Sequence, residues 1–568
     1  MHDITERAIQ RPSPETVFNQ TPPLGDVDLF TTDAALCDAL AREGANQATT
    51  ELQCIGTELG DARNAELARL ANQHAPVWKS FDPQGHRVDR IEFHPAWHAL
   101  MEGIVARGFH ASPWEKHRAR GHLVRAAGYL MQARVEQGTL CPTTMTYGAI
   151  PAMQKDAWLA REWIPRIVSR EYDPRDIPIA GKRGALIGMG MTEKQGGSDV
   201  RANTTRAERI TGESADAHAD AGYRLTGHKW FYSAPQCDAH LVLAYASDQV
   251  GRDEGLTCFF VPRFEPDGTK NAVHLQRLKD KVGNRSNASS EVEFDDAWAH
   301  RLGEPGRGVP TILEMGTYTR LDCVIGTAGM MRESVVQAIH HARHRASFGA
   351  RLVDHPLMQS VLADLAIESE AATALAMRLA RAFDAADDES EILFRRLMTS
   401  ASKFWVCKRG PELAAEAMEV LGGNGYVEEG PLARIYREMP VNSIWEGSGN
   451  IMCLDVLRAF SKSSRTGEVI VEELAQQRGR HAVFDAALER FAARVDARAY
   501  DEASARSLVR SLVTLEQAAL LLQSGSTVMS DAFCATRLDA DARWGGVYGD
   551  AVANIDARSI IDRAWPEQ

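Results

Sequence analysis

The chain has 568 residues, a net charge of -13 and a pI near 5.8, with 44% hydrophobic and 25% charged residues. This composition is that of a globular protein, and the length predicts about two to four domains. The acidic balance excludes attraction of the whole surface to nucleic acid or anionic lipid, so such partners require a local basic patch.

The cysteines and the N-terminus bear on the cellular compartment. Nine cysteines are scattered along the chain, odd in number and without a Cys-x-x-Cys pair, which predicts reduced thiols. The segment from Met1 to Glu15 mixes charged residues with two prolines and lacks the apolar core of a signal peptide. No stretch approaches the ~20 apolar residues of a membrane span. We therefore expect a cytoplasmic protein with no membrane partner.

The N-terminal third has helical periodicity. A polar, proline-rich arm extends to about Asp28, and apolar residues then recur at helical spacing over 36–71 and over 95–134. Pro142 is expected to end the second helical tract, after which more helix follows. The sequence thus predicts an N-terminal arm and an all-helical domain over residues 1–183.

The apolar period changes near Ala185. Short strand-like runs separated by turn residues follow at 186–192, 223–232, 240–245, 257–261 and 291–294. Strands at this spacing, without intervening helices, predict a compact antiparallel barrel or sandwich and exclude a Rossmann unit. We assign residues 184–305 to this domain.

Helical periodicity returns at about Val309. It predicts long helices at 312–347, 356–383, 391–421 and 450–460, which indicate a helical-bundle domain over residues 306–460. A break rich in Ser, Lys, Arg and Gly follows, and residues 461–568 are expected to form an appended C-terminal helical domain. The predicted fold class is therefore α+β and multidomain.

The stretch at 443–454 is the main candidate for chemistry. It sets one carboxylate, Glu446, among small residues at a predicted loop-to-helix junction. Gly447 and Gly449, which follow Glu446, let a flat ligand approach the backbone. Ser448 and Asn450 add polar groups beside the free N–H donors of the helix start. A plain helix cap also explains small polar residues here, so the stretch alone leaves both interpretations open.

Other segments hold candidate binding groups. The glycine-rich turn at 188–199 is typical of a cofactor loop or of a simple hairpin, and the aromatic strand at 227–233 either stacks on a planar ligand or lines a core. Arg345 either holds a pyrophosphate or lies exposed at a helix end. The paired histidines, at 94 and 98 and at 340–344, lack zinc-type spacing, so no metal site is predicted.

Six short motifs follow one another along the chain. They are Met-Thr-Glu…Gly-Gly-Ser-Asp (191–199), Gly-His-Lys-Trp-Phe (227–231), Gly-Asn-Arg…Glu-Val-Glu-Phe (283–294), Arg-x-x-Phe-Gly (345–349), Gly-Gly-Asn-Gly (422–425) and Trp-Glu-Gly-Ser-Gly (445–449). In this order and spacing, over about residues 30–460, they resemble the acyl-CoA dehydrogenase family. The resemblance implies the fold of that family, a homotetramer, FAD as cofactor, an acyl-CoA thioester as substrate and an electron-transfer partner.

The resemblance also implies which residues bind FAD. They are Met189, Gly190, Met191, Thr192, Gly197 and Ser198 from the glycine-rich turn, Phe231, Tyr232 and Ser233 from the aromatic strand, and Ser448 and Asn450 from the last bundle helix. Motif residues expected to reach the flavin of a neighbouring subunit are Arg345, Phe348, Gly422 and Gly423. The family commonly has glutamine where this chain has Glu419, which leaves that contact open.

The resemblance further implies the catalytic groups. Glu446 falls at the usual position of the catalytic base. Some members place the base earlier, directly before an arginine, where this chain has Thr319 before Arg320. We therefore assign catalysis to Glu446, with Arg320 beside it. The implied reaction removes the substrate α-proton while hydride passes from the β-carbon to the flavin, which gives a 2-enoyl-CoA.

The appended domain suggests a second function, because family members with such a domain are associated with DNA and the response to alkylation damage. Residues 461–568 contain about 13 Lys and Arg against about 16 Asp and Glu, so the domain is not basic as a whole. Candidate contacts to the phosphates of double-stranded DNA are Arg458, Arg490, Arg494, Arg498, Arg506 and Arg510. A solvated face paired with acidic residues is the alternative. Two functions thus stay open: an acyl-CoA dehydrogenase of the alkylation response, or a DNA-associated flavoprotein with weak or vestigial dehydrogenase activity.

Overall fold

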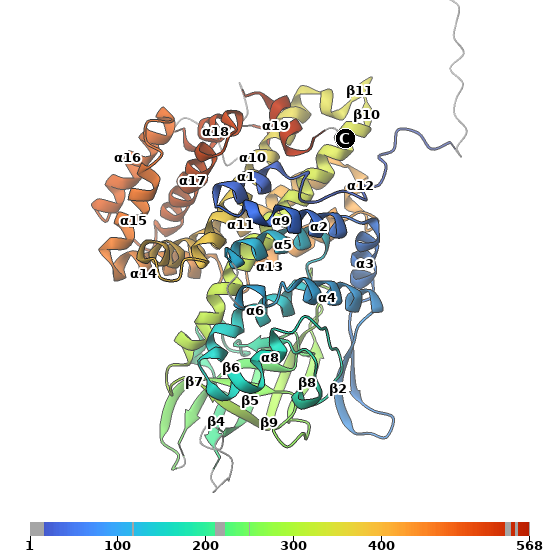
Figure 1. Ribbon diagram of the computed structural model, residues 1–568, viewed down its shortest axis with the longest axis vertical. Coiled ribbons are helices and arrows are strands. Elements are labelled where there is room, and N and C mark those ends of the chain that lie inside the picture. The colour runs from blue at the N-terminus through green and yellow to red at the C-terminus, as the bar shows by residue number, and fades with distance from the viewer. Residues whose placement is uncertain are drawn as a thin grey trace, which may run out of the picture.

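The protein is a helical body with a β domain at one end (Figure 1), as a computed structural model of the chain shows. The structure describes residues 16–115, 119–210, 222–248, 250–539, 547–550 and 555–566. The segment from Met1 to Glu15, for which no signal peptide is predicted, lies outside these ranges. The predicted α+β multidomain class is confirmed.

Eight helices precede the β domain in the described part of the chain. They are α1 (Ala34–Arg42), α2 (Thr49–Leu59), α3 (Ala62–Gln73), α4 (Pro95–Arg107), α5 (Gly121–Val135), α6 (Leu140–Gln154), α7 (Ala157–Glu162) and α8 (Ile164–Ile167). Aspartate side chains cap the first N–H groups of α1, α3 and α7, as free helix donors require. Every residue of α5 is buried, so this helix lies in the centre of the helical body.

Two expectations for this region were wrong. The domain is not all-helical, because β1 (Val77–Phe81) and β2 (Arg87–Glu92) form a hairpin, in which exposed and half-buried residues alternate along β1. Pro142 does not end a helix but lies in the first turn of α6, where its missing N–H removes no helical hydrogen bond.

The β domain is built around a closed circuit of strands. Its strands are β3 (Ile187–Gly190), β4 (Arg206–Arg209), β5 (Gly222–Ser233), β6 (Ala239–Ser247), β7 (Asp253–Pro262), β8 (Val273–Leu278) and β9 (Ser289–Leu302). Pairing runs from β5 through β4, β6, β7 and β9 back to β5, which closes a barrel. Most pairs are antiparallel as predicted, whereas β6 pairs in parallel with both β3 and β4.

Long helices form the bundle that contains the candidate base. They are α9 (Gly308–His344), α10 (Pro356–Phe383) and α11 (Glu389–Val420), followed by the shorter α12 (Gly423–Tyr426), α13 (Leu432–Asn442) and α14 (Gly449–Lys462). A small hairpin of β10 (Ala346–Ser347) and β11 (Ala350–Arg351) joins α9 to α10. The helices predicted at 312–347, 356–383, 391–421 and 450–460 are confirmed as α9, α10, α11 and the shorter α14, and α12 and α13 are additional.

The C-terminal part adds helices beside the bundle and then returns to it. It contains α15 (Ser464–Ala475), α16 (Ala482–Asp496), α17 (Ala505–Gln523), α18 (Thr527–Phe533) and α19 (Ala557–Ala564). Helix α19 packs against α10 and α1, where Arg563 forms ion pairs with Glu370 (2.8 Å) and Asp38 (2.7 Å). Among the described helices, none is both long and apolar enough to cross a membrane.

Candidate active site

Glu446 lies in the short connection between α13 and α14, in an unusual backbone conformation. Its φ is +59° and that of Gly447 is +107°, so two consecutive residues adopt the left-handed region. This conformation is unfavourable for a glutamate and persists only where surrounding contacts impose it.

Cations from two bundle helices supply those contacts. Arg320 of α9 donates from Nε to the Glu446 carbonyl oxygen (2.9 Å), and Lys403 of α11 donates to the Gly447 carbonyl oxygen (2.8 Å). Asp455 of α14 lies 3.6 Å from Arg320 and forms a bidentate pair with Arg396 of α11 (2.8 Å for both bonds). The loop is thereby fastened to α9 and α11, and Arg320 holds the backbone of Glu446 rather than its carboxylate.

The Glu446 carboxylate has one hydrogen-bond donor close to it. The Thr319 hydroxyl donates to Oε2 at 2.7 Å. Burial raises the pKa of Glu446 above its ordinary value, while the Thr319 hydrogen bond and the charges of Arg320 and Lys403 oppose that rise. The result is a carboxylate more basic than a surface glutamate, as a group that removes protons from carbon needs to be.

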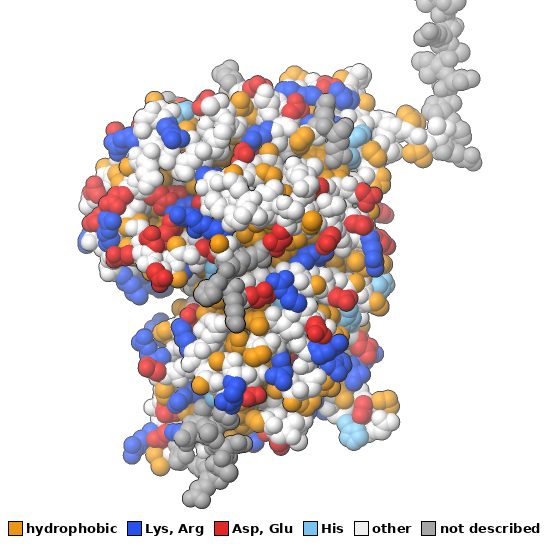
Figure 2. All heavy atoms as spheres, in the orientation of Figure 1, with side chains coloured by type: hydrophobic (Ala, Val, Ile, Leu, Met, Phe, Trp, Pro, Cys, Tyr) orange, Lys and Arg blue, Asp and Glu red, His pale blue; other side chains and the backbone are white. Residues whose placement is uncertain are grey.

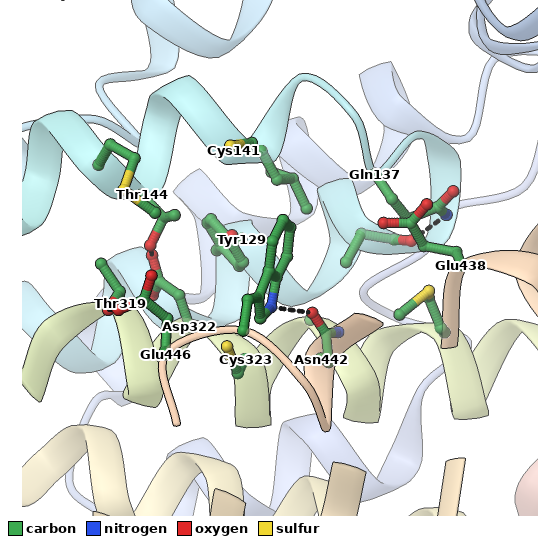
Figure 3. A pocket seen from close by; sticks show the side chains of 16 residues that line it. Tyr129, Gln137, Cys141, Thr144, Thr319, Asp322, Cys323, Glu438, Asn442 and Glu446 are labelled. Atoms are coloured by element: carbon green, nitrogen blue, oxygen red, sulfur yellow. Dashed lines mark hydrogen bonds between the residues drawn. The ribbon is translucent and has the colours of Figure 1, made fainter. Parts of the chain in front are cut away.

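A narrow cavity of about 30 Å³ extends from Glu446 between α5, α6, α9 and α13. Figure 3 shows Glu446, Thr319, Asp322 and Thr144 at one end and Glu438 with Gln137 at the other. Cys141 and Cys323 lie between the two polar ends, and the lining also includes Ala133, Leu140, Met145 and Met330. The site therefore offers a slim, mostly apolar channel with a carboxylate at each end.

Strand β3 of the β domain is packed against the same region. The Thr146 hydroxyl of α6 accepts from the Ile187 N–H (2.9 Å), which fixes β3 to the helix that lines the cavity. Trp445, next to the candidate base, packs on the hydrophobic cluster that includes Met189. Met189 at the start of the glycine-rich turn and Trp445 beside Glu446, which are far apart in sequence, thus belong to one hydrophobic cluster.

The residues expected to bind FAD fit a flat aromatic ligand. Phe231 is 45% exposed at the end of β5, and the Lys279 ammonium lies 4.8 Å from the centre of its ring. A Cβ atom on Gly197 would lie 3.3 Å from the Thr192 side chain, so glycine keeps this turn tight. Exposed Ser198 adds a hydroxyl to the same turn. Aromatic, hydroxyl and cationic groups of this kind suit a flavin ring and its phosphates.

Tyr232 is placed differently from the expectation. Its ring is buried inside the barrel and stacks on His240 at 3.8 Å, because successive side chains of a strand point to opposite faces. A Cβ atom on Gly190 would lie 2.6 Å from the Tyr232 ring, so this glycine makes room for the tyrosine. A cofactor contact for Tyr232 would therefore involve its backbone rather than its ring, and Gly190 has a packing reason.

The motif residues expected at a neighbouring flavin lie on the surface. Phe348, at the tip of the β10–β11 hairpin, is 98% exposed with a φ of +52°. Cβ atoms built on Gly422 and Gly423 would meet no atom within 4 Å. Arg345 donates to the Asn19 carbonyl oxygen at 2.5 Å. These surfaces are open within the single chain.

The candidate DNA-binding arginines fall into two groups. Arg494 donates to the Ala499 carbonyl oxygen (3.1 Å), and Arg506 donates to the Asn450 side-chain oxygen (2.9 Å), so both have structural partners within the chain. Arg490 is exposed but also donates to the Leu538 carbonyl oxygen (3.4 Å), whereas Arg458, Arg498 and Arg510 lie exposed. Figure 2 shows acidic and basic side chains intermingled over the lobe that α15–α17 form in Figure 1, as the sequence count indicates.

Sequence reasoning missed three residues of the site. Lys403 and Asp455 fasten the Glu446 loop, and Glu438 closes the cavity. A signal exists for Lys403, because it is a lone lysine in a buried stretch of α11. No local pattern indicates Glu438, because its role depends on α13 lying against the loop that contains Asn284.

Comparison with known families gives the class of the protein. The chain matches the family models described as adaptive response protein AidB N-terminal domain (residues 19–174), acyl-CoA dehydrogenase middle domain (188–297) and acyl-CoA dehydrogenase C-terminal domain (306–461). The chain therefore belongs to the acyl-CoA dehydrogenase family of FAD-dependent oxidoreductases. The predicted family, cofactor and enzyme class are confirmed.

Individual relatives narrow the comparison. AidB of Escherichia coli (strain K12) is 49% identical over 526 residues, which are 92% of this chain and 94% of that protein. The crystal structure of Caenorhabditis elegans ACDH-11 in complex with C11-CoA has a TM-score of 0.81 and 25% identity, and the match covers 100% of this chain and 95% of that one. An acyl-CoA dehydrogenase of Bacillus anthracis complexed with FAD has a TM-score of 0.61 and 18% identity, covering 78% of this chain and 80% of that one. The chain is thus of the AidB type.

Proposed function

We propose that the protein oxidises an acyl-CoA thioester to the 2-enoyl-CoA, with Glu446 as the base that removes the α-proton. The observation that carries this proposal is the position of the Glu446 carboxylate at one end of a slim apolar cavity, with a raised pKa and a fixed loop. The apolar and sulfur-containing side chains that line this cavity suit contact with an acyl chain.

Different residues are proposed to position the base and to bind FAD. Thr319 orients the Glu446 carboxylate, and Arg320 and Lys403 hold its loop, so that proton removal needs little reorganisation. FAD, when bound, supplies the oxidising capacity for the β-carbon hydride. Residues proposed to hold it are Met189, Met191, Thr192, Gly197, Ser198, Phe231, Ser233, Ser448 and Asn450.

Anaerobic titration of the yellow protein with a panel of acyl-CoAs tests the function. If the proposal is correct, at least one thioester bleaches the flavin absorbance within the time of a turnover. Unchanged absorbance across the panel would refute dehydrogenation and favour the alternative of a DNA-associated flavoprotein with weak or vestigial activity.

The hydrogen bond from Thr319 predicts a pH effect. In Thr319→Val the bond that lowers the Glu446 pKa is lost, so that pKa rises further. Because the base acts when deprotonated, kcat/KM falls as pH drops through its pKa, and the fall begins at higher pH in the variant. The measurement is kcat/KM against pH, with Thr317→Val as control, because Thr317 donates only to the Leu313 carbonyl oxygen (3.0 Å) of its own helix. Identical profiles for the two variants would contradict this role of Thr319.

A homotetramer is part of the proposal. The exposed Phe348 and the open surface at Gly422 and Gly423 support a neighbouring subunit there, with Arg345 beside it. Sedimentation equilibrium of the FAD-loaded protein is expected to give four chains, and Phe348→Asp is expected to shift the protein toward smaller species.

Association with double-stranded DNA during the alkylation response is the second proposed function. It is supported by the exposed arginines 490, 498 and 510 and by the AidB relative. In Arg490→Ala/Arg498→Ala/Arg510→Ala, the slope of log affinity against log salt concentration is expected to fall by about three, because each phosphate contact contributes about 0.9.

Arg465→Ala is the matched control for the DNA experiment. Arg465 is in the same domain and pairs with Glu472 at 2.8 Å, so its loss is not expected to change the salt slope. Absence of duplex binding by the unmodified protein at low salt would reject the DNA function and leave the dehydrogenase proposal untouched.

A further inference from the structure

A buried ion pair joins the two segments that are proposed to hold FAD. Glu193 of the glycine-rich turn and Lys229 of strand β5 have side chains that are 0% exposed, and Lys229 Nζ lies 2.7 Å from Glu193 Oε1. Thr192 directly precedes the glutamate, and Phe231 follows the lysine by two residues. Because both charged groups are shielded from the surface, they can influence a ligand only through their neighbours.

The Glu193 carboxylate holds the glycine-rich turn in shape. It accepts hydrogen bonds from the backbone N–H groups of Thr204 (2.6 Å) and Thr205 (3.2 Å), from both threonine hydroxyls (3.0 and 2.6 Å) and from the Gln195 amide (2.7 Å). The Glu193 backbone also closes a tight turn, because its N–H donates to the Gly196 carbonyl oxygen at 3.0 Å. One carboxylate thus ties the turn to the segment that precedes β4.

The Lys229 ammonium connects the same turn to the sheet. Strand β6 pairs with β3 as far as Val242 and with β4 only from Tyr245 onward, which leaves a gap in the pairing. Lys229 donates to the Leu243 carbonyl oxygen within this gap (2.7 Å) and also to Glu193. One ammonium group therefore fastens the turn to the sheet where strand pairing is interrupted.

Strand β5 is irregular where it meets the ion pair. Its register with β9 shifts between Lys229 and Tyr232, and both of these side chains are buried, whereas Phe231 is exposed. Trp230 donates its backbone N–H to the Thr192 carbonyl oxygen at 2.8 Å. The ion pair and this hydrogen bond together fix the separation between Thr192 and Phe231.

Stability alone is a weak reason for a pair of this kind, because desolvation of two buried charges offsets much of their attraction. Apolar side chains of similar size would fill the same space without that penalty. The charges differ from apolar groups in direction, since each one fixes the other and the polar groups around it.

We propose that the Glu193–Lys229 pair positions the FAD site, by holding Thr192 of the glycine-rich turn at a fixed distance from Phe231 of β5. The affinity for FAD then depends on two residues that do not contact the cofactor. The inference rests on the proposed FAD-binding residues and names what positions them.

Release of FAD from the FAD-loaded protein tests this role. In Lys229→Met, Glu193 loses its cation and its link to β6, so the dissociation constant of FAD is expected to rise at least about tenfold, the effect of losing one buried hydrogen bond to a charged group. Flavin fluorescence after dilution measures the released FAD. Visible circular dichroism of the FAD that stays bound is expected to change, because it reports the orientation of the flavin.

Lys182→Met is the matched control. Lys182 Nζ lies 3.0 Å from Asp238, and the lysine side chain is 2% exposed. Asp238 also accepts from the Leu186 N–H (2.8 Å), so this pair supports the chain before β3 rather than the turn after it. We expect the control to lose stability and to keep its affinity for FAD. Equal dissociation constants of FAD for the two variants would overturn the proposal.

A pH profile keeps the test decisive if Lys229→Met does not fold. Burial lowers the pKa of Lys229 to about 8, although Glu193 opposes that change, so the folded protein loses this charge as pH rises through about 8. The affinity of the unmodified protein for FAD is therefore expected to fall between about pH 7 and pH 9. A constant affinity over this range would contradict the proposal.

The groups around Lys229 do not gain or lose charge over this range. Burial raises the pKa of Glu193, but the Lys229 charge and the hydrogen bonds outweigh that effect and bring it to about 2. Burial lowers the pKa of His228, next to the lysine, so this histidine is neutral. The group that meets Lys229 from β6 is a backbone carbonyl.

Glu193→Gln distinguishes positioning from a purely structural role. Loss of the opposite charge lowers the pKa of Lys229 further, so the fall in FAD affinity is expected to begin at lower pH than in the unmodified protein. A structural role alone would change the affinity without moving the pH at which it falls, and that result would also overturn the proposal.

The outcomes separate this inference from the proposed function, because release of FAD requires no acyl-CoA. If Phe231→Ala weakens FAD binding and Lys229→Met does not, the positioning role is wrong and the proposed FAD-binding residues stand. If neither variant changes FAD binding, both are wrong. Bleaching of the flavin by acyl-CoA tests the dehydrogenation alone.

Discussion

Glu446→Gln is expected to slow flavin reduction by acyl-CoA between about a hundredfold and ten-thousandfold, the range that a positioned general base contributes. Glutamine keeps the size of the side chain and accepts the Thr319 hydrogen bond but cannot take up the α-proton. The loop contacts from Arg320 and Lys403 go to backbone carbonyls and persist in the variant. FAD content and acyl-CoA affinity are therefore expected to stay close to those of the unmodified protein.

Single-turnover reduction, followed by flavin absorbance, is the measurement for this variant. Glu489→Gln, an exposed position on α16, is the control and is expected to reduce at the unmodified rate. An unchanged rate in Glu446→Gln would show that another group removes the proton.

Arg125→Met is expected to lower the free energy of unfolding by about 3–5 kcal/mol. Arg125 of α5 and Asp322 of α9 form a bidentate pair at 2.7 and 2.8 Å, and their side chains are 0% and 1% exposed. Asp322 also lines the cavity, and removing its partner leaves a charge buried next to the candidate base. The loss is therefore expected to reduce both stability and flavin reduction.

Denaturant unfolding of the FAD-loaded protein measures this loss. Arg161→Met removes a surface pair with Glu162, whose side chains are 59% and 44% exposed, and is expected to change stability by less than about 1 kcal/mol. The double variant Arg125→Met/Asp322→Leu is expected to recover part of the stability, because no uncompensated charge remains. Equal stability of the two single arginine variants would contradict the argument.

The features of the fold that depend on long periodic segments were predictable from the sequence. The helical pattern over 356–383 coincides with α10, and the change of period near Ala185 places the start of the β domain close to β3. Features that depend on distant contacts were not. The β1–β2 hairpin is stabilised by docking on the barrel, where Arg87 donates to the Leu275 carbonyl oxygen (2.5 Å). Local periodicity contains no information on that contact.

In the candidate site too, residues of a contiguous motif could be predicted from the sequence, whereas residues brought together by distant contacts could not. Glu446 and its glycines form a contiguous motif, so the sequence indicates them directly. Lys403 and Asp455 act through the Glu446 loop only because α9, α11 and α14 converge there. The motif names Phe231 and Tyr232 together, whereas the strand turns their side chains to opposite faces, so the motif alone does not indicate which of the two rings is exposed.

The return of α19 to α10 and α1 has a consequence for the order in which the protein is completed. Asp38 leaves the ribosome long before Arg563, its ion-pair partner. Until α19 has been synthesised, the surface that α1 and α10 share therefore stays uncovered. During that time Glu370 lacks Arg563, its ion-pair partner. A product truncated before Arg563 retains all the candidate catalytic residues but keeps this surface uncovered. Docking of α19 thus covers this surface, and chaperones and proteases that bind exposed apolar surface are expected to distinguish chains with α19 from chains without it.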